Sequence, residues 1–411
     1  CQGDDGQNGQ DGKDAPVPLN PADDLPGVVA EITALTGGTG PGGAFRVGDR
    51  ISVTFNMKTD AGEVLETSDM SRGAVMVSGP TFNYQRVIAS QGDLMTASVP
   101  LGGGSYRYTF AMPIPSTYID PINYTGTFKD GVLTGQPLLD GTYTVGIEAR
   151  QDYEIEGQPY RDVANATMHC RHGGATTLVS RSVVDNANCT VCHKRFSAHG
   201  ENRNNVTNCL LCHTAGAEDK NVSTVEVGTP DITIDFKVMI HKIHAGASLP
   251  SVNGVTTATT GDRDYTATPK PYRIVGYRNS VHDYSHVAFP VWPTLYAGMP
   301  RDVGYSDGTT PADDIKRSKE DAVLRGPVAC AKCHGDPDGS GPGTAPAQGD
   351  LIYSQPTRAA CGSCHDDWVW SRKYRSNGTF MLQQDDNSAC TQCHKVTGKE
   401  IDVMDAHMHP P

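Results

Sequence analysis

The pattern Cys-x-x-Cys-His occurs five times from residue 189 onward, and it constrains the fold more than any other feature of the sequence. In this pattern two thiols lie one turn apart and an imidazole follows directly. The spacing matches the two vinyl groups of a haem, which the thiols hold covalently while the histidine binds the iron. The five copies are CTVCH at 189–193, CLLCH at 209–213, CAKCH at 330–334, CGSCH at 361–365 and CTQCH at 390–394.

A single Cys-x-x-Cys pair is also typical of a redox dithiol or of half a zinc site. Zinc sites do not require a histidine after the second cysteine, and here all five copies have one. The sequence therefore predicts five covalently bound haem c groups. Their attachment residues are Cys189, Cys192, Cys209, Cys212, Cys330, Cys333, Cys361, Cys364, Cys390 and Cys393, and their proximal ligands are His193, His213, His334, His365 and His394.

The remaining histidines are numerous enough to fill the second axial position of every iron. The chain has 14 histidines, and those outside the motifs are His169, His172, His199, His241, His244, His282, His286, His407 and His409. We expect His199, in KRFSAHG, to fold back over a neighbouring haem. The segment 236–246 predicts a short amphipathic helix with His241 and His244 on nearly the same face, one for each of two haems.

Two further distal ligands are less constrained by the sequence. In VHDYSHVAFP we favour His286 over His282, because the apolar residues after it suit packing against a porphyrin. At the C-terminal end of the sequence His407 is favoured over His409 and over Met408. Iron with two histidine ligands has no open position for a substrate, so this arrangement predicts electron conduction.

Residues 25–182 show a different pattern. Apolar residues alternate with polar ones at 51–57, 106–110 and 143–149, and turn signals such as PLGGGS and KDG separate these runs. We expect an antiparallel β domain, a sandwich or a barrel, that acts as a spacer and docking surface. Residues 183–411 then form a pentahaem cytochrome c domain with short helices and loops.

The first 24 residues are Gly, Asp, Asn and Pro with almost nothing apolar, which predicts a flexible tether. The sequence starts at Cys1, as does a bacterial lipoprotein after signal-peptide removal, so we expect a lipid anchor there; a disulfide with Cys170 is the alternative. No apolar run approaches the ~18 residues of a membrane-spanning helix. The net charge of −13 and the lack of a Lys/Arg cluster argue against nucleic acid as a partner.

Two other clusters carry weaker signals. In MHCRH at 168–172, His169, Cys170 and His172 are candidates to bind a metal, or to ligate a haem across a domain or subunit boundary. Alternate residues of a strand face opposite ways, so the three side chains cannot all reach one ion. DPDGSG resembles the opening of a calcium loop, with Asp336, Asp338 and Ser340 spaced for oxygen ligation. The twelfth position of that loop is Ala347 instead of Glu, so the calcium match is incomplete.

The order of these features resembles the OmcA/MtrC family of outer-membrane multihaem cytochromes. The resemblance rests on the starting cysteine with its GDDG tail, the β domain, RSVVDNANCTVCHKRFSAHG, MIHKIHAG, SHVAFP and the further motifs. It implies electron transfer at the cell surface to iron or manganese oxides, flavins, electrodes or partner cytochromes, with a porin–cytochrome complex as source. It also implies distal roles for His199, His241, His244 and His286, and it does not decide between His407 and His409.

The family has two such units and ten haems, whereas this sequence holds one unit. A single unit is compatible with a smaller surface reductase, a shuttle or a subunit that polymerises. In a polymer, His169, His172 and His409 would be available to ligate a haem of the neighbouring copy. The alternative class is a pentahaem enzyme of the nitrite reductase type. Such enzymes need one open haem and a lysine in place of a motif histidine, and all five motifs here end in histidine.

Overall fold

The computed structural model describes residues 26–155, 158–194, 196–219, 232–292, 301–302, 308–327, 330–336, 344–376 and 379–390. These residues form two compact units. Unit 1 contains the described parts of Cys1–Arg181 and His193–Glu218, and unit 2 contains those of Ser182–Cys192 and Asp219–Pro411. The second motif therefore belongs to the unit that is otherwise built from strands, although composition alone places it in the haem domain.

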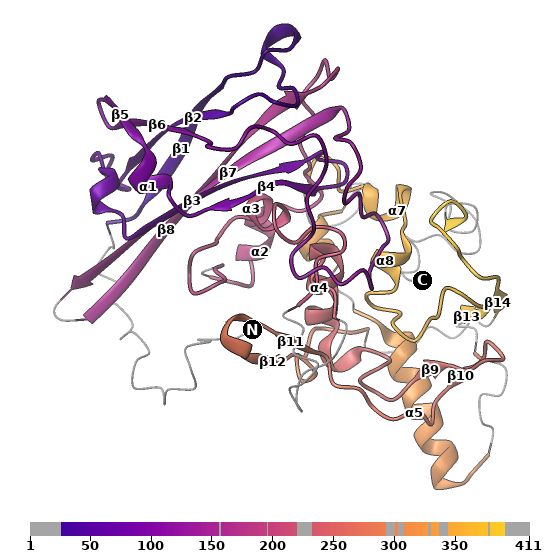
Figure 1. Ribbon diagram of the computed structural model, residues 1–411. Coiled ribbons are helices and arrows are strands. Elements are labelled where there is room, and N and C mark those ends of the chain that lie inside the picture. Colours follow the sequence, from indigo (N-terminus) through magenta and orange to yellow (C-terminus); the bar gives the residue numbers. More distant parts are fainter. Residues whose placement is uncertain are drawn as a thin grey trace. The chain divides into compact units, whose positions relative to one another are not determined.

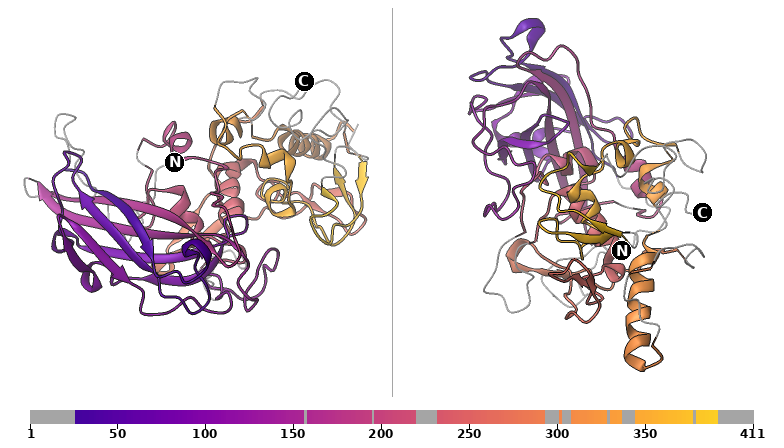
Figure 2. Two further views of the ribbon diagram at one scale, coloured as in Figure 1. Left: turned by 90° about the horizontal axis from the view of Figure 1, so that it is seen from above. Right: turned by 90° about the vertical axis from the view of Figure 1, so that its right-hand side faces the viewer.

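Unit 1 is built from two four-stranded antiparallel sheets (Figure 1, Figure 2). One sheet has the order β1-β2-β6-β5 and the other β4-β3-β7-β8. The strands are β1 (Val29–Thr36), β2 (Ser52–Lys58), β3 (Arg72–Gly79), β4 (Gln85–Gln91), β5 (Val99–Gly102), β6 (Ser105–Thr109), β7 (Gly141–Ile155) and β8 (Gln158–His172). The unit also contains α1 (Leu94–Ala97), α3 (Val206–Leu210) and the short 3-10 helices Pro41–Gly43 and Thr67–Asp69.

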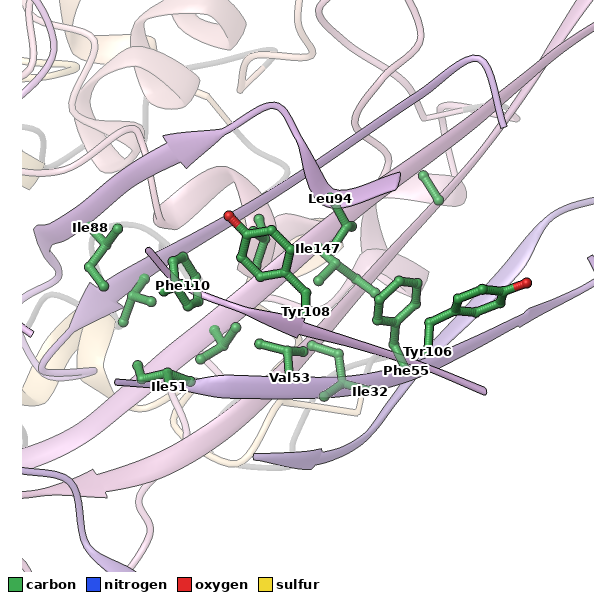
Figure 3. Close-up of a cluster of buried hydrophobic side chains, with 14 of the residues drawn as sticks. Ile32, Ile51, Val53, Phe55, Ile88, Leu94, Tyr106, Tyr108, Phe110 and Ile147 are labelled. Atoms are coloured by element: carbon green, nitrogen blue, oxygen red, sulfur yellow. The ribbon is translucent and has the colours of Figure 1, made fainter. Parts of the chain in front are cut away.

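The predicted alternation is the reason that these strands form. In β2 and β6 every second residue is buried. Residues 142–149 of β7 are instead all buried, because both faces of this strand are covered. Figure 3 shows Phe55, Tyr108 and Ile147, from β2, β6 and β7, within one cluster of buried side chains. That cluster draws on both sheets, so the sandwich is confirmed; the two sheets are separate, and neither closes into a barrel.

Unit 2 consists of short elements joined by loops. Its helices are α2 (Asn186–Thr190), α4 (Phe236–Ala245), α5 (Pro311–Arg325), α6 (Cys330–His334), α7 (Leu351–Ser354) and α8 (Arg358–Cys361), with 3-10 turns at Gly246–Ser248 and Tyr277–Asn279. Three two-stranded antiparallel ribbons pair β9 (Thr256–Thr257) with β10 (Arg263–Asp264), β11 (Arg273–Val275) with β12 (Val281–Asp283), and β13 (Tyr374–Ser376) with β14 (Thr379–Met381).

The helix predicted at 236–246 is present as α4. Asp235 caps it by accepting a hydrogen bond from the Lys237 amide, and Gly246 ends it with a φ of 41°. No helix in the described part of the chain has the length and apolar character needed to cross a bilayer.

Candidate haem iron sites

Four of the five Cys-x-x-Cys-His motifs are fully described, and they share one local geometry. In the motifs at 189, 209 and 361 the amide of the second cysteine donates to the carbonyl of the first, each at 3.2 Å. The motif at 330 forms the single helical turn α6. The backbone thus holds each pair of thiols one turn apart, as attachment to the two edges of a porphyrin requires.

The thiols of these motifs are in the chemical state that haem attachment needs. Among the described residues every motif cysteine is a free thiol. Burial raises the pKa of Cys361 to about 11 and that of Cys364 to about 12. A redox-active dithiol has the opposite property, a thiol with a lowered pKa. The surroundings of the fourth motif therefore disfavour the thiolate that disulfide exchange requires.

The second motif brings its histidine opposite a predicted distal ligand. Nε2 of His213 faces Nε2 of His199 at 3.4 Å, with ring centroids 5.7 Å apart. His213 is buried, while His199 is an exposed residue whose Nε2 approaches that of His213. Desolvation, helped by the positive charge of Arg203, lowers the pKa of His199 to about 3. The ring of His199 is thus neutral near pH 7, the form in which imidazole binds a metal.

The third motif repeats this arrangement in unit 2. The ring of His334, at the end of α6, lies 6.0 Å from that of His241 on α4, between centroids. Desolvation lowers the pKa of His241 to about 4, and the neighbouring His334 and His244 act in the same direction. Burial also lowers the pKa of His334.

These two pairs fit an iron with two axial imidazoles. Metal–imidazole bonds of about 2 Å require about 4 Å between the two nitrogens and about 6 Å between the ring centres. The observed centroid separations are 5.7 Å and 6.0 Å, and the Nε2 atoms of His199 and His213, at 3.4 Å, are about 0.6 Å closer than two iron ligands would be. The donor set also fits: two thiols and one imidazole from the motif, and a second neutral imidazole on the opposite side.

The outer face of the sheet β4-β3-β7-β8 holds the second motif, a placement that the sequence does not indicate. Sγ of Cys212 lies 3.4 Å from Sδ of Met76 on β3, and the hydroxyl of Ser78 donates to the carbonyl of Leu211 at 2.6 Å. α3, which carries Cys209, contacts β8. The β domain is thus more than a spacer, since it provides the surface on which one predicted haem site is built.

Strands β7 and β8 also hold the loop that carries His199. Arg161 donates to the carbonyl of Gly200 at 2.8 Å, and Arg150 donates to the side chain of Asn202 at 3.1 Å. The side-chain oxygen of Asn165 accepts from the amide of Asn204 at 2.8 Å. His199 itself has a φ of 56°, a left-handed conformation that these contacts help to maintain. Both ligands of this site are therefore anchored to the same sheet.

The motifs of unit 2 lie close to one another. The side chain of Asn188, beside the first motif, donates to the carbonyl of Cys333 in the third at 2.6 Å. Cys364 of the fourth motif lies near enough to Cys330 of the third for that thiol to raise its pKa, and Cys390 of the fifth motif does the same to Cys361. The first, third, fourth and fifth motifs thus form a spatial series. Sequence order does not show this, because the second motif lies in unit 1.

The remaining predicted distal ligands are less fully defined. Nδ1 of His244 donates to the carbonyl of Ile240 at 2.8 Å, a hydrogen bond that is usual for metal-ligating histidines. His286 is exposed after β12, and among the described residues it makes no ring contact with a motif histidine. Its alternative, His282, has Nε2 3.0 Å from the Ser280 hydroxyl. Cys1, Cys393, His394, His407, Met408 and His409 lie outside the described residues.

The MHCRH cluster lies on β8, and its side chains divide between two faces. Cys170 belongs to the sandwich core, and His172 packs against Tyr143 with centroids 4.6 Å apart. His169 instead bonds the Thr144 hydroxyl at 2.9 Å. Across the described residues no three His, Cys, Asp or Glu side chains are grouped for a metal ion. Asp338 and Ser340 of the calcium-like loop lie outside the described residues, so that loop stays a prediction.

An ion pair fixes α4 next to the fourth motif. Lys242, between the two α4 histidines, donates to Asp366 at 2.8 Å, and Asp366 also accepts from the amide and hydroxyl of Ser251. We expect Asp366→Ala to lower the free energy of unfolding by about 3 kcal/mol, because it leaves buried donors unpaired. Chemical denaturation measures this. The control is Asp283→Ala, which removes a more exposed pair with Arg273 and should cost about 1 kcal/mol or less; equal losses would contradict the assignment.

Comparison with known proteins agrees with this geometry. A family model described as outer membrane cytochrome MtrC/MtrF-like, domains II/IV, matches residues 181–408. The chain belongs to this family. The OmcA/MtrC resemblance predicted from the sequence is thereby confirmed, and the chain is an outer-membrane cytochrome that binds c-type haem. No curated protein matches the sequence significantly.

Solved structures extend the likeness of this cytochrome to the fold of unit 1. The outer membrane decaheme cytochrome OmcA superposes with a TM-score of 0.50 and 21% identity, over 83% of this chain and 44% of that one. MtrC from Shewanella baltica OS185 gives a TM-score of 0.44 and 17% identity, over 90% of this chain and 43% of that one. The chain thus spans less than half the length of either protein.

Proposed function

We propose that this cytochrome conducts electrons along five bis-histidine c-type haems at the cell surface, toward extracellular acceptors. The observation that carries the proposal is the two neighbouring pairs of imidazoles, His199 with His213 and His241 with His334. When bound, haem iron supplies a one-electron couple. The residues of the chain fill both axial positions, keep substrates from the metal and hold the motifs of unit 2 near one another.

The rest of the proposal follows the sequence predictions. His244, His286 and His407 complete the distal ligands, and His193, His365 and His394 complete the proximal set. The β domain spans 25–182 and the pentahaem domain spans 183–411, with the second motif docked on the β domain. The electron source is a porin–cytochrome complex or another multihaem cytochrome, and the acceptors are metal oxides, flavins, electrodes or further copies in a polymer. The loop that begins at Asp336 is a secondary candidate for binding calcium.

A count of haems and a spin-state measurement test this proposal. The purified protein should carry five haems by intact mass and show only low-spin ferric iron in its electronic and EPR spectra. Cyanide and nitrite should leave the spectra unchanged, because no axial position is open. A high-spin component that binds nitrite would instead support a reductase of the nitrite reductase type, and fewer than five haems would refute the count.

A further inference from the structure

A buried ion pair lies beside the iron site of the second motif and has no role in haem attachment. Nε of Arg203 lies 2.5 Å from Oε1 of Glu148, and the two side chains are 16% and 4% exposed. Arg203 belongs to the loop that presents His199, and its backbone pairs with that of Ala198. Glu148 belongs to β7. We propose that this pair sets the reduction potential of the haem that Cys209, Cys212, His213 and His199 hold, so that a strand of the sandwich tunes one step of electron transfer.

The placement of Glu148 supports this role. Val145, Ile147 and Ala149 of β7 point into the sandwich core, so Glu148 points from the opposite face, on which the second motif lies. The carbonyl of Ile147, the residue before it, is 3.5 Å from the side chain of the buried Asn208 in α3. The charge of Glu148 is thus held at the surface that carries the motif.

Arg203 lies on the same short loop as the predicted ligand His199. The amide of Ala198, next to His199, donates to the carbonyl of Arg203 at 2.8 Å, and the amide of Arg203 donates to the carbonyl of Ala198 at 3.3 Å. Glu148 meets Arg203 from β7, so both charges of the pair lie at this site. A charge held near a metal shifts the metal's reduction potential, and a positive charge favours the reduced form.

Arg203 pairs with only one of the two carboxylate oxygens of Glu148. Its Oε1 accepts from Arg203, but Oε2 is buried and has no hydrogen bond among the described residues. A buried carboxylate oxygen without a hydrogen bond is costly, and its presence in a folded protein calls for an explanation. Here the negative charge offsets Arg203 and stabilises oxidised iron relative to reduced iron.

The test measures the potential of this one haem separately from the others. The inference rests on the proposed function, and in a His199→Ala background only this haem should be high-spin. Its reduction can then be followed at its own absorption band. Adding Glu148→Gln leaves Arg203 uncompensated next to the iron and should shift the midpoint potential of the high-spin haem upward. Adding Arg203→Lys retains the positive charge and should leave the midpoint close to that of the background.

A matched control removes the same charge from the other sheet. Glu31 is exposed on β1, and Glu31→Gln should leave the midpoint of the high-spin haem unchanged. An unchanged midpoint in Glu148→Gln, or an equal shift in Glu31→Gln, overturns the inference while the five haems remain in place. Failure of the proposed function has a different signature, the absence of haem or of low-spin iron from the unaltered protein.

Discussion

Replacing His241 by alanine should convert one haem to high-spin iron and leave the other haems low-spin. The ring of His241 lies next to that of His334, at a centroid distance of 6.0 Å, so its loss should remove the predicted distal ligand of the third haem. EPR and electronic spectra of the oxidised protein measure the change. About one fifth of the total iron should become high-spin if the chain carries five haems.

Two further variants make the assignment specific. His244→Ala should produce a second high-spin haem, and the double variant should produce two, because each histidine of α4 serves a different iron. The thioether bonds do not depend on either histidine, so the intact mass should stay at five haems in each variant. The control is His282→Ala, on β12, which should remain wholly low-spin since His286 is the favoured ligand of that segment. If His241→Ala stays entirely low-spin, its role as a ligand is wrong.

The sequence predicted those parts of the structure that depend on the spacing of apolar residues along a short segment. Alternation of apolar residues at 51–57 and 143–149 led directly to β2 and β7, and the amphipathic segment at 236–246 is α4. One helix was missed although its signals are present. The segment that begins at Thr310 has a capping box with Asp313 and a proline at the first helical position, and it forms α5.

The docking of the second motif on the β sheet could not have been read from the sequence. It depends on contacts between residues more than a hundred positions apart, such as Met76 with Cys212 and Ser78 with Leu211. Composition changes near residue 182, which suggested a boundary there, while contacts assign His193–Glu218 to unit 1. The only sign of this docking in the sequence is Gly146, because a glycine within a strand often marks a site where another segment approaches closely.

Replacing Gly146 by valine should separate the second motif from the sheet. A Cβ atom at this position would lie 2.3 Å from the side-chain oxygen of Asn208 and 2.4 Å from Cδ1 of Leu211, and both of those side chains are buried. Overpacking of this kind costs about 1–3 kcal/mol in the free energy of unfolding, and here the strain falls directly on α3. We therefore expect a lower melting temperature and a fraction of high-spin iron, because His213 no longer meets His199.

The expected pattern distinguishes loss of docking from a general loss of folding. Gly92 is exposed, a Cβ atom there would meet no other atom within 4 Å, and its φ is not positive, so Gly92→Val should leave both the spin state and the melting temperature nearly unchanged. Combining Gly146→Val with His199→Ala should add no further high-spin iron beyond His199→Ala alone, since both changes act on the same haem. Additional high-spin iron in the combined variant would show that Gly146 affects another site, and a wholly low-spin Gly146→Val would show that the sheet does not position this motif.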